Sequence, residues 1–408
     1  PQSHHDIFLY KKYPDRIEQV VFCSEKTAKN VLFDNRPFKN SRRKFSSSIT
    51  TFKFSERLLR VYANFTHSFQ RRDLKSLRNM KYVLLSNGSE MPIVGLGTWK
   101  TQPQEIEDAV QLALENGYRH IDTAYNYNTE EAVGNVVNRW IKDEKLKRED
   151  IFITTKLPVF GNRANDVEKY LKLSLQRLNL NYVDLYLIHM PFSFHSNDEL
   201  NGPLCSGDGK PSLDINDITE TWKAMEKQVE NGLTKGIGLS NFNIDQIRRI
   251  HSSSKIKPAV LQVELHAYLQ QKELRKACND LEIAVTAYAP LGSPGAKSHF
   301  IEKYNYAVQD FPDILGHPVV DKLAEKYQKN PGQILLRHLV QQDVLVIPKS
   351  KNPERIRANI QLFDFELSNE DMELLNELDQ GEKGRIFNFL FFSGVEKHPE
   401  YPFNGLSS

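Results

Sequence analysis

Short apolar runs alternate with amphipathic stretches between residues 93 and 349 of this chain. The runs predicted as strands are 93–97, 118–122, 151–156, 183–189, 236–240, 259–262, 284–288 and 344–349. Alternating strand-like and helix-like segments are typical of a parallel sheet built from βα units, and eight such units make one (β/α)8 barrel. The sequence therefore predicts an α/β fold with a single TIM barrel.

The amphipathic stretches have the spacing and end signals of helices. One carries Trp222, Met225 and Val229 on a single face and ends at Gly232, a residue that commonly terminates helices. The Asn-Asp dipeptide at 165–166 precedes another apolar stripe, and we expect it to cap the helix after the third strand.

Four segments do not belong to the alternating pattern of predicted strands and helices. An Asn87-Gly88 turn between two short apolar runs predicts a β-hairpin that closes the barrel floor. Long loops follow the fourth and seventh strands, at 191–217 and 291–317, and an aromatic tail follows Asp379. Because loops this long inside a compact domain are usually functional, they are candidates for the walls of a site.

Charge divides the chain at Met80. Residues 1–79 hold 17 Lys and Arg against 7 Asp and Glu, whereas residues 80–408 are acidic enough to bring the whole chain to +2. We predict a basic extension over 1–79, disordered or not part of the native protein and with no catalytic role, and a barrel domain over 80–408. A targeting segment or a small binding module are alternatives for the extension. A mildly acidic barrel argues against a nucleic-acid partner.

Other composition signals exclude several classes. The three cysteines, Cys23, Cys205 and Cys278, are far apart, which suits a reducing compartment. No apolar run approaches the roughly 18 residues that a membrane span requires, and no metal-ligand or acyl-transfer motif is present. We expect a cytosolic monomer with no membrane partner and no metal.

The chemistry is concentrated where predicted strands end. Asp122 ends the second strand with Tyr127 just beyond it, Lys156 ends the third and His189 ends the fourth. Singly, such residues are more often packing groups or structural ion pairs. Together they occupy the carboxyl ends of consecutive barrel strands, where catalytic groups gather. An acid, a phenol, an amine and an imidazole suit proton transfer to a carbonyl oxygen, and a cofactor must supply the hydride.

The strings RHIDTAYNY, IFITTK, VDLYLIH and KGIGLSN, in this order, resemble the aldo-keto reductases, in particular the aldose-reductase-like group, from about Lys81 to the C-terminus. The resemblance implies reduction of aldehydes and ketones to alcohols with NADPH. It makes Tyr127 the proton donor and has Lys156 adjust the pKa of that phenol. It has Asp122 support Lys156 and His189 position the substrate. It also implies that Trp99, Tyr127, His189 and Met190 contact a small carbonyl substrate, and that the two loops and the tail wall its pocket.

The predicted cofactor site depends on the last strands of the barrel. No GxGxxG follows a strand, so a Rossmann phosphate loop is missing, whereas a TIM barrel binds phosphate near strands seven and eight. The segment VIPKSKNPERIRAN fits that place. By resemblance, the cofactor residues are Thr98, Ser240, Asn241, Gln262, Tyr288, Leu291, Ser293, Lys349, Ser350, Arg355 and Asn359.

Four positions depart from the family pattern. Pro158 and Met190 stand where aldose reductases carry Trp, which predicts a softer and wider pocket; Ala289 and Ala358 remove two side chains near the cofactor. Two other functions stay open: a ketosteroid or prostaglandin-type reductase with the same four residues, and a catalytically idle barrel with a channel-associated or structural role.

Overall fold

The computed structural model describes two parts of the chain. The described residues are 6–13, 16–24, 27–32 and 81–403, except 198, 208 and 305. They belong to two units, Pro1–Phe65 and Thr66–Ser408.

The first unit contains a three-stranded antiparallel sheet in the order β1-β2-β3. Its strands are β1 (Asp6–Tyr13), β2 (Arg16–Ser24) and β3 (Thr27–Leu32). The sequence showed no periodicity that predicted this sheet. The rest of the extension, and Met80 itself, lie outside the described residues, so the boundary at Met80 stays a prediction.

The second unit is a closed parallel barrel. Its strands are β6 (Leu96–Gly97), β7 (His120–Asp122), β8 (Phe152–Leu157), β9 (Val183–Ile188), β10 (Thr234–Ser240), β11 (Val260–Glu264), β12 (Ala284–Tyr288) and β13 (Leu345–Val346). Each strand pairs in parallel with the next one along the chain. A parallel bridge between Val94 and Val346 joins the two ends, with the Val346 amide 2.8 Å from the Ile93 carbonyl oxygen. This closure confirms the predicted (β/α)8 barrel.

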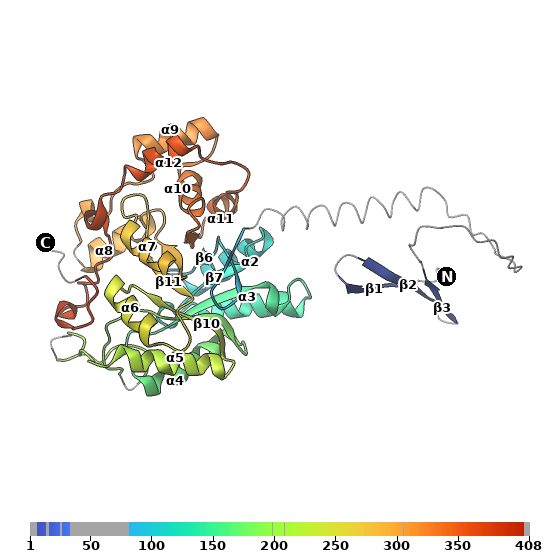
Figure 1. The fold of residues 1–408 in the computed structure, drawn as a ribbon, viewed down its shortest axis with the longest axis horizontal. Helices are drawn as coiled ribbons and strands as arrows, with labels where there is room; N and C mark the ends of the chain where they lie inside the picture. The colour runs from blue at the N-terminus through green and yellow to red at the C-terminus, as the bar shows by residue number, and fades with distance from the viewer. Residues whose placement is uncertain are drawn as a thin grey trace, which may run out of the picture. The chain divides into compact units, whose positions relative to one another are not determined.

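Helices surround the strands, as Figure 1 shows. They are α2 (Pro103–Glu115), α3 (Glu130–Lys142), α4 (Ala164–Leu178), α5 (Ile218–Glu230), α6 (Ile244–Ser253), α7 (Lys272–Asp280), α8 (Lys297–Tyr304), α9 (Pro318–Tyr327), α10 (Pro331–Val340), α11 (Pro353–Ile360) and α12 (Asn369–Asn376). Gly232 follows α5 with a left-handed φ of +71°, as its helix-ending role predicted. The predicted cap of α4 was wrong, because Arg163 is the N-cap and the dipeptide 165–166 lies inside the first turn.

A short hairpin fixes which end of the barrel is free. It pairs β4 (Tyr82–Leu84) with β5 (Glu90–Pro92) around the predicted Asn87-Gly88 turn. The Asn87 side-chain amide donates to the carbonyl of Lys235, 3.0 Å away, at the start of β10. The hairpin therefore lies at the amino end of the strands, and the carboxyl end is left to the long loops and the tail. None of the helices in the described ranges is long and apolar enough to cross a membrane.

Candidate active site

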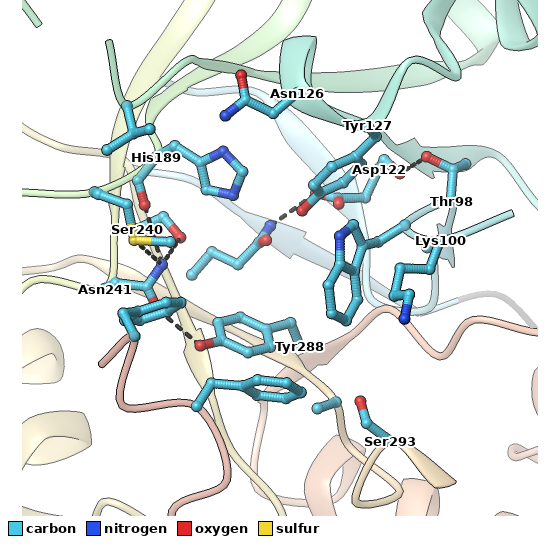
Figure 2. Close-up of a pocket in the computed structure, with 18 of the residues that line it drawn as sticks. Thr98, Lys100, Asp122, Asn126, Tyr127, His189, Ser240, Asn241, Tyr288 and Ser293 are labelled. Atoms are coloured by element: carbon cyan, nitrogen blue, oxygen red, sulfur yellow. Dashed lines mark hydrogen bonds between the residues drawn. The ribbon is translucent and has the colours of Figure 1, made fainter. Parts of the chain in front are cut away.

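A cavity of about 410 Å³ opens at the carboxyl end of the barrel (Figure 2). It gathers side chains that are distant in sequence, because successive parallel strands end at the same rim. The predicted site residues that line it are Thr98, Trp99, Asp122, Tyr127, His189, Met190, Ser240, Asn241, Gln262, Tyr288 and Ser293. No group of three or more potential metal ligands occurs in the described part of the chain.

A buried ion pair lies at the base of this site. The Lys156 ammonium nitrogen is 2.6 Å from Asp122 Oδ1 and donates to the Thr123 carbonyl at 2.9 Å, and both charged side chains are almost fully buried. Gln262 donates to the other Asp122 oxygen at 2.7 Å. Burial lowers the pKa of Lys156, whereas the charge of Asp122 raises it. The two strands β7 and β8 thus hold a cation under the cavity.

Tyr127 and His189 both face the cavity (Figure 2). Their ring centroids are 5.6 Å apart in an edge-to-face arrangement, and Lys156 Nζ lies 4.9 Å from the Tyr127 ring centroid. Burial raises the pKa of Tyr127 well above its usual value, with a contribution from Asp122. Burial, together with the charge of Lys156, holds the pKa of His189 well below its usual value. At neutral pH the site therefore presents a protonated phenol beside a neutral imidazole.

The opposite wall is a hydrogen-bonded platform. The Tyr288 hydroxyl donates to Asn241 Oδ1 at 2.8 Å, and Asn241 Nδ2 lies 3.0 Å from the His189 carbonyl oxygen and 3.1 Å from Ser240 Oγ. Asn241 has a φ of +65°, a left-handed conformation that Asn tolerates better than most residues. Its amide is thus fixed beside an aromatic ring, an arrangement that suits a flat amide-bearing ligand.

The remaining predicted cofactor residues lie apart from the cavity lining. Lys349 and Ser350 follow β13, and α11 begins three residues after Ser350, with Asn352 accepting from the Arg355 amide at 3.0 Å. The Arg355 side chain is exposed and Asn359 is buried. Cations at a helix N-terminus suit a phosphate group. Leu291 is half-buried against both apolar cores.

Lys100 is a cavity residue that the sequence reasoning missed. Its ammonium nitrogen is buried without a hydrogen-bond partner among the described residues and lies 5.6 Å from the ring centroids of Trp99 and Phe300. Burial, reinforced by repulsion from Lys349 and Lys303, lowers the pKa of Lys100 to about 8. An unpaired cation beside a second cation favours an anion between them. The site therefore fits a phosphate-bearing cofactor.

Two of the three predicted pocket segments, the loop at 291–317 and the tail after Asp379, supply an aromatic wall, whereas no described residue of the loop at 191–217 lines the cavity. Phe300 of α8 lies 5.4 Å from Phe387 of the tail, and Tyr304 lies 4.8 Å from Phe391, centroid to centroid. Glu264, at the end of β11, accepts from the amides of Ile386 and Phe387 at 2.8 and 2.9 Å. The FNFLFF run pointed to the tail, but no local signal identified Glu264 as its anchor.

Two of the residues that depart from the family pattern line the cavity. Met190 lines the cavity, and its sulfur is 3.3 Å from Asn241 Nδ2, so it contacts the platform as well as the pocket. Ala289 also lines the cavity and has a left-handed φ of +50°.

Comparison with known proteins places the chain in a family. The pattern of the Aldo/keto reductase family matches residues 93–380. Aldo-keto reductase family 1 member A1 of Gallus gallus is 44% identical over 329 residues, which cover 79% of this chain and 97% of that protein. Its Homo sapiens counterpart is 43% identical over 328 residues, with 79% and 98% covered.

Solved structures show the same similarity. The aldose reductase of Schistosoma japonicum superposes with a TM-score of 0.71 at 41% identity, covering 80% of this chain and 100% of that one. A Bombyx mori aldo-keto reductase in complex with NADP gives 0.68 at 36%, covering 79% and 98%. This chain belongs to the aldo-keto reductase family. It is an NADP-dependent oxidoreductase of the aldose-reductase-like group.

Proposed function

We propose that this protein reduces aldehydes and ketones to alcohols, with Tyr127 as the proton donor. The observation that carries the proposal is the shared orientation of Tyr127 and His189 into one cavity, their rings 5.6 Å apart, above the Lys156–Asp122 pair. A phenol that keeps its proton at neutral pH can give it to a carbonyl oxygen. A neutral His189 can donate a hydrogen bond to the same oxygen and orient it.

NADPH supplies the hydride when it is bound. Lys100, Lys349 and Arg355 are the cations that suit its phosphates, and Asn241 with Tyr288 suits its nicotinamide amide and ring. The NADP complex of the Bombyx mori relative supports this choice of cofactor. With both partners held, Tyr127 provides the proton and Lys156 keeps a positive charge beneath the phenol.

Lys156 supports the proton transfer through its charge. Its ammonium nitrogen is held by Asp122 at 2.6 Å and lies 4.9 Å from the Tyr127 ring centroid. Burial raises the pKa of Tyr127, so the phenol keeps its proton at neutral pH. The ammonium beside the ring stabilises the phenolate that remains once the proton has passed to the carbonyl oxygen.

The aromatic wall favours substrates with an apolar body. A sugar hydroxyl placed against Phe300, Phe387 or Phe391 would lose its hydrogen bonds to water without replacement. A ketosteroid or prostaglandin-type substrate is compatible with the same wall.

For the oligomeric state and the location of the protein, we propose a monomer in the cytosol.

A panel assay tests the proposal. NADPH consumption is measured with simple aldehydes, aldoses, ketosteroids and an enone, and the products are identified. We expect alcohols, including from the enone, because in relatives that reduce a carbon–carbon double bond a Glu stands where this chain has His189. A saturated ketone as the product, or no turnover across the panel, would overturn the proposal.

A further inference from the structure

A second buried carboxylate lies behind the catalytic groups. Glu130 is the first residue of α3, and its side chain has no exposed surface. The Thr155 hydroxyl donates to Glu130 Oε1 at 2.7 Å, and Arg177 Nη1, from α4, is 3.4 Å from Oε2. Thr155 is the neighbour of Lys156 on β8. The carboxylate thus joins the strand that carries Lys156 to a helix on the outside of the barrel.

Arg177 continues this connection to the loop of Tyr127. Its guanidinium carbon lies 3.9 Å from the Tyr125 ring centroid, and Nη1 donates to the Tyr125 carbonyl at 3.3 Å. Tyr125 begins the short 3-10 helix η1 (Tyr125–Tyr127), and its own hydroxyl donates to the Leu200 carbonyl at 2.9 Å. The residue two positions before Tyr127 is therefore held at one face of its ring, at its hydroxyl and through its backbone.

A cluster of buried hydroxyls holds the other flank. Thr129 Oγ1 is 3.1 Å from Thr98 Oγ1 and 3.0 Å from Thr123 Oγ1, and none of the three residues is exposed. Thr98 Oγ1 also donates to the Asp122 carbonyl at 2.9 Å. The loop is thus fixed two residues before and two residues after Tyr127, while the phenol between them faces the cavity.

We propose that Glu130 and Arg177 are positioning residues for the reaction, with Glu130 fixing the Tyr127 loop through Arg177 and the Lys156 strand through Thr155. The inference rests on the proposed function, since it assigns Tyr127 and Lys156 their roles. Neither residue touches the cavity, so neither is a catalytic residue. Misplacing a reacting group by about 1 Å can cost on the order of a hundredfold in rate. An anchor of this kind therefore affects turnover more than binding.

The negative charge of Glu130 also affects the pKa of Lys156. Asp122 from β7 and Tyr127 from η1 contact Lys156, and His189 from β9 and Glu130 from α3 are close enough for their charges to interact with it. Asp122 and Glu130 both raise the pKa of Lys156, against the larger lowering by burial. Removing the Glu130 charge thus makes Lys156 lose its proton at a lower pH.

The test compares Glu130→Gln with Glu131→Gln, which changes the next residue of the same helix, exposed to solvent. For Glu130→Gln we expect kcat to fall about tenfold or more, with KM and the NADPH Kd changed by less than about threefold. The alkaline limb of kcat moves to lower pH. Glu131→Gln keeps the wild-type values. A Glu130→Gln protein with wild-type kcat and pH profile would overturn the inference.

A second variant addresses folding, because an uncompensated buried group destabilises a protein. Arg177 is about one-third exposed, and Arg177→Met removes the link to Tyr125 from the outside. It should also lower kcat with little change in KM, and Arg177→Lys should restore part of the loss. Unchanged kcat in Arg177→Met, or failure of both Glu130→Gln and Arg177→Met to fold, would contradict a positioning role.

Tyr127→Phe is measured in parallel to separate this inference from the proposed function. If Tyr127→Phe stays active, the proposed function fails. If it is inactive while Glu130→Gln has normal activity, only this inference fails.

Discussion

Replacing Asp122 by Asn leaves the buried ammonium of Lys156 without its carboxylate partner. The Lys156 ammonium would keep the Thr123 carbonyl at 2.9 Å but lose its carboxylate at 2.6 Å, with no exposed surface through which water could compensate. Removing one partner of a buried ion pair typically costs about 3–5 kcal/mol. We expect a loss of that order in the free energy of unfolding at neutral pH, together with a large loss of kcat.

The pH dependence of that loss has a definite sign. Asp122 raises the pKa of Lys156, so the substitution lowers this pKa further below its value in the unfolded chain. Between the two values the unfolded state binds more protons, and stability therefore rises with pH. Urea unfolding at about pH 7 and about pH 9.5 should show the defect of the variant shrinking at the higher pH.

A matched control removes one partner of an exposed ion pair that has the same nitrogen–oxygen distance as Lys156 and Asp122. Glu220 Oε1 is also 2.6 Å from Lys223 Nζ, but both side chains are more than half exposed. Exposed pairs contribute little to stability, so Glu220→Gln should unfold at nearly the wild-type urea concentration. Equal destabilisation by the two substitutions, or a fully active Asp122→Asn protein, would refute the reasoning.

Three further predictions follow from other parts of the molecule. Arg355→Met should weaken NADPH binding about ten- to a hundredfold while leaving NADH almost unchanged, because it removes a charge-assisted contact to the extra phosphate; equal Kd changes for both cofactors would contradict this. Because the pKa of His189 is held well below its usual value, kcat should be flat between about pH 6 and pH 8, and a limb centred near about pH 6.5 would show that His189 titrates in the catalytic range. A chain that starts at Met80 should fold and keep full catalytic efficiency, and a several-fold fall would show that the extension contributes to the enzyme.

Much of the barrel was predictable because its signals are local. Each strand lies within a predicted apolar run or extends it by at most two residues, for example β10 at its start and β11 at its end. The side chains of Asp122, Lys156 and His189 meet because parallel strands end together, a rule that needs no knowledge of the packing. The same rule brought Asn241 and Tyr288 to one wall.

The contacts that were not predictable depend on packing between distant segments. Glu264 meets the tail amides across more than a hundred residues, and Phe300 meets Phe387 only once α8 has folded over the rim. Lys100 lacks a hydrogen-bond partner among the described residues, and Lys349 and Lys303 come close enough to lower its pKa. The spacing of these lysines in the sequence does not predict that they meet. The balance that sets the pKa of Tyr127 likewise depends on burial, which the sequence does not state.

The most direct test of the account is single-turnover hydride transfer in Tyr127→Phe. The variant is loaded with NADPH, mixed with a simple aldehyde, and followed by the loss of cofactor absorbance. Loss of the proton donor should slow this step by about 10²- to 10⁴-fold, while the Kd for NADPH and the urea midpoint of unfolding stay at the wild-type values. A near-normal rate would contradict the assignment of Tyr127 as the acid and, with it, the mechanism proposed for this site.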